Sequence, residues 1–500
     1  MKLASTQPPS LSHISAPLLP GAIPARTPIP PPLMLTRTAA SRPLSRAQAF
    51  ALASSLLVIP LVFWQHWLYG FLFAFVASST LLYFAILGLK SHLAVLSATG
   101  ATLSVSDAEV KIAAQSKLPP FTLLVPLYHE GALVPALITS LAKLRYPVES
   151  LQVLLLLEAD DQDTHMALAQ VGLPLQFTVL DIAPEALRTK PKACNAGLLH
   201  ARGAFIGVYD AEDAPDADQL LKVVAGFLKS DPGVACLQAK LAFTNHSQNF
   251  LTRFFAAEYA TYFNLLLPGL DRLGLPTPLG GTSNFFRTQT LRALGGWDPY
   301  NVTEDLDLGM VLARSRLRIL TLDSTTHEVA TWLVSRWLRQ RTRWIKGYIQ
   351  TWFVHMRNPV QLCKDLGPLG FFGFLLLVGG TPLVLLLNPL FWGLTLIYAF
   401  TGSSLVASLY PTPLYWVGLF SMVVGNFIFI WLAMAGCMRQ GLHSSVKWMA
   451  LLPLYWLLMS VAAWWAAWQF FRRPHYWDKT DHAGHSFSPA TSPVSFEVQS

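Results

Sequence analysis

The chain has 500 residues, of which 53% are hydrophobic and only 13% are charged, and its mean hydropathy is +0.41. Soluble domains carry about a quarter charged residues, so this composition excludes a wholly soluble protein and predicts that a large part lies in lipid. The 36 basic residues exceed the 28 acidic ones, which gives a net charge of +8. Residues 1–47 contribute basic side chains and no acid. We therefore assign the excess positive charge to a tail and to the flanks of membrane spans, and no nucleic-acid partner is expected.

The N-terminal part divides into a tail and an apolar block. Residues 1–47 are rich in Pro, Ser, Ala and Arg, which predicts a disordered basic tail. The block from Phe50 to Leu89, broken at Gln65-His66, is far longer than the apolar core of a signal peptide. We expect a transmembrane hairpin over 48–90. One long span with a re-entrant lead is the alternative, because the first half is short for the roughly 20 residues that a bilayer requires.

Charges return over residues 100–362, where apolar strand-like runs alternate with helical patterns. Continuous apolar strands between helices are typical of a parallel sheet covered on both faces, as in α/β domains. Ligands of such sheets bind at the carboxyl ends of the strands. The expected strands are Phe121–Val125, Leu151–Leu157, Leu175–Leu180, Ala204–Val208 and Val234–Leu237, and the expected helices lie near 131–144, 164–171, 191–201 and 217–229.

The C-terminal part is apolar again. Between Gly367 and Phe471 the only charged residues are Arg439 and Lys447. We expect a transmembrane bundle of about four helices over 367–471. The expected spans lie near 369–387, 389–409, 413–436 and 448–471, with turns at Asn388-Pro389 and Pro411-Thr412-Pro413.

Charge flanking the spans predicts the orientation. Basic residues precede the first span and follow the last one, and the six expected spans place both termini and the 100–362 domain on one side. By the positive-inside rule that side is the cytoplasm, so the 100–362 domain and a tail over 472–500 are expected there. Arg439 and Lys447 face outward in this topology, which conflicts with the rule.

The first acidic cluster, Glu158-Ala159-Asp160-Asp161, directly follows a predicted strand. One interpretation is a helix N-terminus, because an Asp before a helical pattern accepts hydrogen bonds from free N–H groups. The other interpretation places a carboxylate at the carboxyl end of the sheet, where it binds a nucleobase. The residues alone leave both open.

The second cluster, Asp210–Asp213 (DAED), also follows a predicted strand. Carboxylates at positions i and i+2, here Asp210 and Glu212, can bind one hard cation such as Mg²⁺ or Mn²⁺ together with substrate phosphates. A solvated acidic turn is the alternative. Upstream, Lys190 and Lys192 are natural partners for a diphosphate.

A third group combines acids with a basic, Trp-containing stretch. A carboxylate can deprotonate an attacking hydroxyl, an Arg can neutralise a leaving diphosphate, and a Trp offers a flat apolar face. A basic, Trp-containing helix near lipid is more often an interfacial anchor, which is the alternative for the second half of the group. The residues concerned are Thr303, Glu304, Asp305, Asp307, Gln340, Arg343 and Trp344.

The order of these motifs, followed by a membrane bundle, resembles glycosyltransferase family 2 of the processive, cellulose-synthase-like kind. The resemblance is strongest to bacterial exopolysaccharide glycosyltransferases and covers about residues 118–485, with LEADDQDT, KPKACN, YDAED and WDKTDH. It implies an α/β GT-A (Rossmann-like) cytoplasmic catalytic domain inserted between transmembrane helices. It also implies a UDP-sugar donor, Mg²⁺ or Mn²⁺, inversion at the anomeric carbon, and a multi-pass protein of the bacterial inner (plasma) membrane.

Donor-side roles carry over by position. Glu158 and Asp160 match the uridine-contacting acids of the family, and Lys192 matches its basic residue at this point of the motif. Asp210 and Glu212 match the metal-binding pair. Because the second acid here is Glu, Asp213 is an alternative second ligand.

Catalytic and acceptor-side roles carry over in the same way. Asp305 matches the catalytic base, and Arg343 matches the residue that holds the diphosphate. The small-residue segment 280–284 resembles the acceptor-side loop, where the backbone approaches a sugar. The acceptor-binding residues implied are Gln340, Trp344, Thr303 and Glu304.

These roles predict an inverting hexosyltransferase that uses a UDP-sugar, with glucose as the expected sugar, to extend a β-linked exopolysaccharide through the bundle. Partners for polysaccharide export are then expected. The alternative is a non-processive enzyme that adds one sugar to a membrane lipid, because lipid glucosyltransferases share a Q-x-x-R-W-like motif. A third interpretation is a transporter with a cytoplasmic regulatory domain. The spans lack acids and paired broken helices, which disfavours it.

Overall fold

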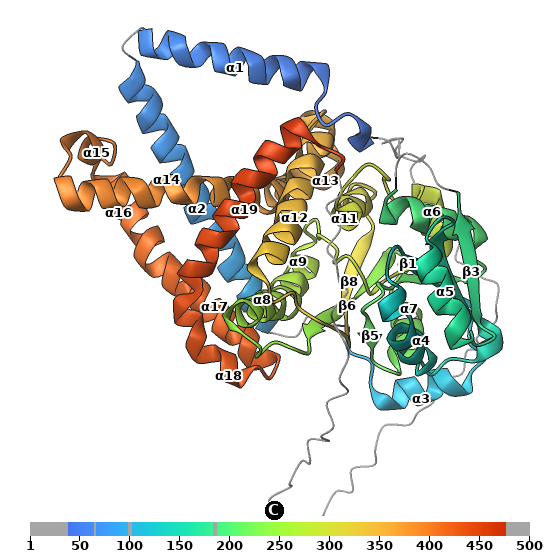
Figure 1. Cartoon of the computed structure of the whole chain (residues 1–500). Helices are drawn as coiled ribbons and strands as arrows, with labels where there is room; N and C mark the ends of the chain where they lie inside the picture. The colour runs from blue at the N-terminus through green and yellow to red at the C-terminus, as the bar shows by residue number, and fades with distance from the viewer. Residues whose placement is uncertain (1–38, 65–66, 99–102, 184–187, 477–500) are drawn as a thin grey trace, which may run out of the picture.

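The computed structural model describes residues 39–64, 67–98, 103–183 and 188–476. An α/β domain lies beside a group of long helices, and helix α12 runs at the junction between them (Figure 1). Most of the tail expected over 1–47, and nearly all of the tail expected over 472–500, fall outside the described residues.

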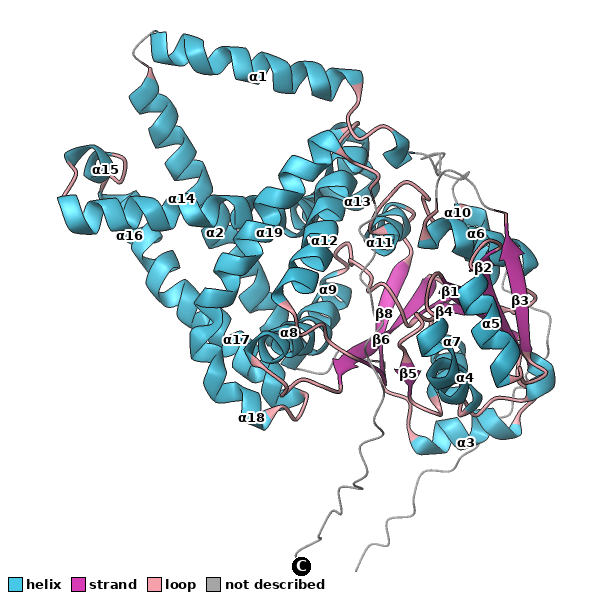
Figure 2. Cartoon of the chain, viewed as in Figure 1, coloured by secondary structure: helices cyan, strands magenta, loops and turns pink. Residues whose placement is uncertain are grey.

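An eight-stranded mixed sheet, in the order β3-β2-β1-β4-β7-β6-β8-β5, forms the centre of the α/β domain (Figure 2). The first four strands in this order are parallel, and all five predicted strands are present. The expectation of a parallel sheet is wrong for two strands, because β7 runs antiparallel to β4 and β6, and β5 runs antiparallel to β8, whereas β6 and β8 pair parallel. The strands are β1 (Phe121–Leu127), β2 (Leu151–Glu158), β3 (Phe177–Ile182), β4 (Phe205–Val208), β5 (Ala214–Pro215), β6 (Val234–Phe243), β7 (Asn284–Arg287) and β8 (Arg318–Glu328).

Helices cover both faces of the sheet, as the continuous apolar strands predicted. Successive residues of a strand point to opposite faces, so Leu123 of β1 joins one buried apolar cluster and Leu124 joins the other. The four predicted helices are α4, α5, α6 and α7. The helices of this region are α3 (Asp107–Gln115), α4 (Val134–Ala142), α5 (Gln162–Val171), α6 (Lys190–His200), α7 (Gln219–Lys229), α8 (Phe250–Thr261), α9 (Leu267–Leu273), α10 (Thr288–Leu294), α11 (Glu304–Arg314) and α12 (Val334–His355).

Four helical segments of the described chain are long and apolar enough to cross a membrane: Leu68–Ala98, Pro359–Thr401, Thr412–Arg439 and His443–Arg472. Helix α1 runs away from α2 rather than alongside it (Figure 1), and the hairpin over 48–90 stays a prediction. The helices are α1 (Arg46–Trp64), α2 (Leu68–Ala98), α13 (Pro359–Phe374), α14 (Gly380–Thr401), α15 (Ser404–Ser408), α16 (Thr412–Phe420), α17 (Asn426–Arg439), α18 (His443–Val446) and α19 (Leu452–Arg472).

The turn expected at Asn388-Pro389 is wrong, because α14 continues through Pro389. Proline removes one backbone hydrogen bond of a helix and exposes carbonyl groups in the preceding turn. The Tyr83 hydroxyl of α2 lies beside that turn and hydrogen-bonds the Val384 carbonyl at 3.1 Å and the Asn388 side chain. Such contacts from neighbouring helices let a membrane helix tolerate proline.

The membrane helices pack directly onto the α/β domain. Helix α12 lies along α19, α8 lies against α17, and the end of α2 lies against α9. At the last contact, a Cβ on Gly269 would fall 2.4 Å from the Leu93 carbonyl oxygen, so only glycine permits this approach. These contacts bring the carboxyl edge of the sheet next to the membrane bundle.

Candidate active site

The first acidic cluster divides between a structural and an exposed role. Asp161 is the N-cap of α5, since its carboxylate accepts from the Thr164 amide at 3.3 Å and also from the His129 amide at 2.6 Å. Glu158 ends β2, is buried, and lines a large cavity. Asp160 pairs with Arg188 at 2.7 Å and is not part of the cavity lining, whereas Arg188 is.

The DAED turn after β4 is held together by its last acid. Asp213 accepts a hydrogen bond from the Asp210 amide at 2.8 Å and another from the Thr282 hydroxyl, so one of its oxygens fixes the turn. Burial, with the charges of Asp210 and Glu212, raises the pKa of Asp213 well above its ordinary value. The turn thereby presents Asp210 and Glu212 to the cavity.

The two lysines of the KPK segment point in different directions. Lys190 opens α6 and forms an ion pair with Asp210, and its ammonium also donates to the Gly281 carbonyl at 2.5 Å. Burial favours a lower pKa of Lys190, but the Asp210 and Glu304 carboxylates outweigh it and raise the pKa. Lys192, two residues along the helix, faces outward toward the Ala183 carbonyl at 3.4 Å. Lys190, and not Lys192, therefore lines the cavity.

The residues present fit a divalent cation. Glu328, at the end of β8, lies near the DAED turn, and burial with the charges of Asp213, Glu212 and Asp210 raises its pKa well above the usual range. One buried carboxylate oxygen of Glu328 and one of Asp213 have no hydrogen-bond partner in the described part of the chain. Among the described residues no three His, Cys, Asp or Glu side chains form a ready-made metal site. A cation at Asp210 and Glu212 would thus need substrate phosphate oxygens as further ligands.

The T-E-D segment forms the start of α11. Asp305 lines the cavity, and its Oδ1 accepts from the Leu306 amide at 2.8 Å. Opposite it, a Cβ on Gly281 would lie 3.4 Å from Asp305 Oδ2, so the 280–284 loop faces this carboxylate. Burial raises the pKa of Asp305, and burial with the Asp305 charge raises the pKa of Glu304 to about 7. A carboxyl group with a raised pKa suits proton abstraction near neutral pH.

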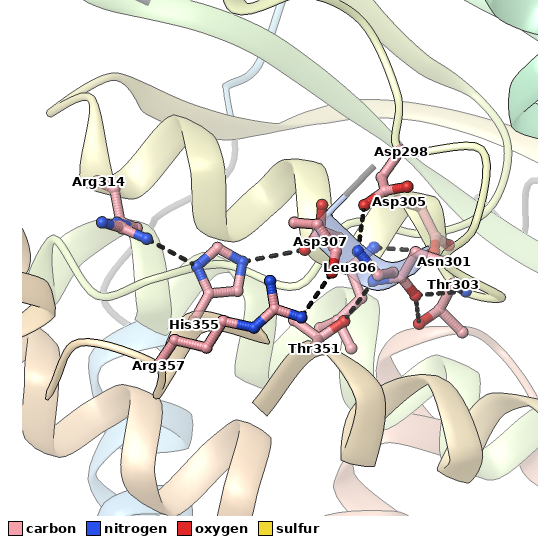
Figure 3. Close-up of polar contacts among 12 residues, drawn as sticks. Asp298, Asn301, Thr303, Asp305, Leu306, Asp307, Arg314, Thr351, His355 and Arg357 are labelled. Carbon is pink, nitrogen blue, oxygen red and sulfur yellow. Dashed lines mark hydrogen bonds and ion pairs between the residues drawn. The ribbon is translucent and has the colours of Figure 1, made fainter. Parts of the chain in front are cut away.

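A buried polar network fixes α11 against α12 (Figure 3). His355 lies between Arg314 and Asp307, with its ring nitrogens 3.3 Å and 3.0 Å from these partners. Asn301, just before α11, donates to the Thr351 hydroxyl at 3.0 Å. His355 and Asn301 could not be found from the sequence, because a contact between residues about fifty positions apart leaves no periodic signal.

The Q-x-x-R-W segment lies on α12 and borders the same cavity. Gln340, Arg343 and Trp344 all line it, as does Thr303. Arg343 donates to the Val302 carbonyl at 3.3 Å, which places its guanidinium beside the start of α11. Trp344 packs in an aromatic cluster, stacked on Tyr259 at 6.3 Å between ring centroids.

One cavity of about 680 Å³ thus collects most of the predicted site residues, namely Glu158, Asp210, Glu212, Thr303, Glu304, Asp305, Gln340, Arg343 and Trp344. Asp160 and Lys192 are not brought into it. Tyr128, Arg188 and Glu328 also line the cavity and were not predicted from the sequence. A position at the end of a strand could have identified Tyr128 and Glu328.

The cavity continues beyond these polar residues into the membrane bundle. Its lining there is mostly apolar and comes from four long helices. The residues are Tyr83, Ile86, Leu87 and Lys90 of α2; Thr381, Pro382, Val384, Leu385, Asn388 and Trp392 of α14; Asn426, Phe429, Leu432 and Ala433 of α17; and Leu452, Tyr455, Trp456 and Met459 of α19. The carboxylates and the membrane helices therefore share one cavity.

The fold is that of the GT-A glycosyltransferases. The mannosyltransferase PcManGT from Pyrobaculum calidifontis, in complex with GDP-Man and Mn²⁺, superimposes with a TM-score of 0.52 over 80% of this chain and 99% of that one. At 18% sequence identity this similarity shows the fold alone.

A family model described as "Glycosyl transferase family group 2" matches residues 205–471, more than half of the chain. The chain therefore belongs to this family. A beta-monoglucosyldiacylglycerol synthase of Trichormus variabilis is 29% identical over 259 residues, 50% of this chain and 54% of the relative. The same enzyme of Synechocystis sp. is 30% identical over 268 residues, 52% of this chain and 54% of the relative. The chain spans about half the length of these relatives, and the resemblance to the processive, cellulose-synthase-like kind stays a prediction.

Proposed function

We propose that the chain is a membrane-bound inverting glycosyltransferase that transfers a hexose from a nucleotide-sugar to a hydroxyl of a membrane lipid. The observation that carries this proposal is the single cavity that joins Asp305 to the apolar faces of the membrane helices. Such a cavity suits an acceptor that enters from the bilayer. The two synthases named above make a glucosylated diacylglycerol, which supports glucose as the sugar and a lipid as the acceptor.

The donor is a UDP-sugar held at the carboxyl edge of the sheet. Glu158 contacts the uracil, and Lys190 and Arg343 lie where they can pair with the diphosphate. A divalent cation, Mg²⁺ or Mn²⁺, held by Asp210 and Glu212 would supply further positive charge for the departing diphosphate. Charge that is fixed in place before the reaction is usually the largest contribution to catalysis.

Asp305 is the catalytic base. It takes the proton of the acceptor hydroxyl while that oxygen attacks C1 of the sugar from the face opposite UDP, and the bond from C1 to the diphosphate oxygen breaks. Attack from the opposite face inverts the anomeric carbon. Gln340, Trp344, Thr303 and Glu304 line the same cavity as Asp305, and in this proposal they bind the acceptor.

The test is transfer of label from UDP-glucose by the purified full chain in lipid nanodiscs. We expect label in the organic extract, and we expect Asp305→Asn to reduce it by about 10²–10⁴-fold, the usual contribution of general-base catalysis, while UDP still binds. Asp307→Asn is unsuitable as a control because Asp307 anchors α11 through His355. Asp323→Asn, which alters an exposed ion pair with Lys240, is a better control. Normal transfer by folded Asp305→Asn would contradict the assignment.

A second candidate is extension of a β-linked exopolysaccharide. The aromatic lining of the cavity favours it, since Trp344, Trp392 and Trp456 offer flat faces on which a sugar chain can stack. Long chains would then appear early while most acceptor stays unextended, and export partners would be required. A single glycolipid product would leave only the first proposal.

We also propose that the catalytic domain faces the cytoplasm of a bacterial inner membrane. The four candidate spans support a membrane location. The basic residues at Arg472-Arg473 support the cytoplasmic side, and the nearby His475 lies 3.4 Å from the Tyr300 carbonyl of the catalytic domain. A reporter inserted at residue 110 should then report the cytoplasm, and a signal from the opposite side of the membrane would contradict the orientation.

A further inference from the structure

Lys90 is the only Asp, Glu, Lys or Arg in the candidate span α2, and its side chain lines the cavity. Charged residues within membrane spans are costly, and they usually mark a functional site or have an identifiable partner. We therefore expect either a partner for the Lys90 ammonium group near its side chain or a function for its charge.

The depth of Lys90 is fixed by the residues that follow it on α2. Leu93 packs against Gly269 of α9, and the Leu96 carbonyl accepts from Arg272 at 2.9 Å. The last two turns of α2 thus lie on the catalytic domain, and Lys90 lies about one helical turn before Leu93. This is the level at which the bundle meets the domain, where lipid headgroups lie.

The nearest carboxylate is already bound by other groups. Glu258 of α8 accepts from Arg341 at 2.7 Å with one oxygen and from the Tyr455 hydroxyl at 2.7 Å with the other. Glu258 attracts Lys90 electrostatically. Among the described residues, however, Lys90 has no hydrogen bond or ion pair, and its closest recorded contact is the Phe429 ring at 5.6 Å.

The charges at this level of the cavity do not balance. Arg341 is almost fully buried between aromatic rings, 4.3 Å from the Phe255 centroid and 4.6 Å from that of Trp344. Arg341 and Glu258 neutralise each other, so the charged form of Lys90 is uncompensated, and burial makes that form costly. An anionic group of a ligand would compensate it.

Tyr348 lies between the catalytic end of the cavity and the Glu258–Arg341 pair near Lys90. Tyr348 of α12 is within electrostatic range of Asp305 as well as of Glu258 and Arg341. A lipid with its anionic group at Lys90 could therefore extend a headgroup hydroxyl toward Asp305. Its acyl chains would lie along Leu385 of α14 and Leu432 of α17, which line the apolar part.

We propose that Lys90 binds the phosphate of the acceptor lipid, so that the acceptor is an anionic glycerophospholipid with a free hydroxyl on its headgroup. This inference rests on the proposed function and specifies its substrate class. The headgroup O–H loses its proton to Asp305, the oxygen bonds to C1 of the sugar, and UDP leaves. The lipid phosphate does not react.

The experiment measures transfer from labelled UDP-glucose by the full chain in phosphatidylcholine vesicles that contain equal amounts of phosphatidylglycerol and diacylglycerol. We expect the wild type to glycosylate phosphatidylglycerol preferentially. Lys90→Met should lower the ratio of the two products by about tenfold to a hundredfold, the range for loss of a hydrogen bond to a charged group. Lys90→Arg should keep the preference. Lys447→Met is the matched control, because Lys447 lies at the end of another span, over the Trp448 ring and outside the cavity lining.

Other outcomes distinguish failure of the Lys90 inference from failure of the proposed function. Equal use of both lipids by the wild type would overturn the role of Lys90 and leave the proposed function standing, even if Lys90→Met failed to fold. An unchanged ratio of the two glycosylated lipids in folded Lys90→Met would likewise overturn the role of Lys90 and leave the proposed function standing. Inhibition of transfer by soluble glycerol phosphate would contradict the claim that the anionic group at Lys90 belongs to a lipid. Transfer to neither lipid would overturn both the inference and the proposed function.

Discussion

The close contact between Gly347 of α12 and Thr303, just before α11, predicts the effect of adding one methyl group at Gly347. A Cβ on Gly347 would lie 2.1 Å from Thr303 Oγ1 and 2.4 Å from Thr303 Cγ2. Carbon atoms in contact need about 3.5 Å, so in Gly347→Ala the two helices must separate by about 1 Å. That separation moves Asp305 away from Arg343. A displacement of this size costs about 10²-fold in rate, so we expect kcat to fall by that factor.

Stability should change less than activity. Overpacking costs about 1–3 kcal/mol, and the better helix propensity of Ala offsets about 1 kcal/mol of it. The assay is the initial rate of label transfer, with thermal unfolding measured in parallel. Gly393→Ala on α14 is the control, since a Cβ there meets nothing within 4 Å.

A second substitution tests the cause directly. Thr303→Ala removes both of the closest atoms, so the double variant with Gly347→Ala should be more active than Gly347→Ala alone. This is a positive coupling in a double-mutant cycle. Wild-type kcat in Gly347→Ala, or no gain in the double variant, would refute the argument.

Two further predictions concern charge. Asp210→Ala, or excess chelator, should weaken UDP binding and abolish transfer. Glu212→Ala should reduce UDP binding and transfer more than Asp213→Asn does. Full activity in excess chelator, measured by label transfer, would contradict the cation site. Asp298, which accepts from the Ala40 amide at 2.8 Å, has a pKa raised by burial from 3.8 to about 7. The folded protein then binds the extra proton, so the contribution of Asp298 to stability is greatest below about pH 4 and is lost as the pH rises toward 7. Asp298→Asn should flatten this fall in thermal unfolding, and an identical pH slope would disprove it.

Much of the parallel half of the sheet could be predicted from the sequence. Strands such as Leu151–Glu158 are buried on both faces, and their continuous apolar runs are a strong local signal. The strand Arg318–Glu328 was missed because polar residues such as Asp323 and Thr325 interrupt it. It pairs with Val234–Phe243, a contact between distant segments that no local pattern encodes.

Only the part of the site that lies in sequence motifs could be predicted. The carboxylates at 158, 210 and 305 follow strands or begin a helix, and the fold gathers them at one edge. The choice between Lys190 and Lys192 depended on the starting residue of α6, and helix boundaries are the least certain feature of a sequence prediction. The continuity of the cavity into the bundle depends on how α2, α14, α17 and α19 pack, which composition alone does not specify.

Transfer of one sugar with inversion to a lipid that enters from the membrane defines the product. The structure of the isolated product should be determined by mass spectrometry and NMR after the full chain in nanodiscs has used UDP-α-glucose labelled at C1. We expect a lipid that carries one hexose in β-linkage. A hexose in α-linkage, or a polymer without lipid, would contradict it.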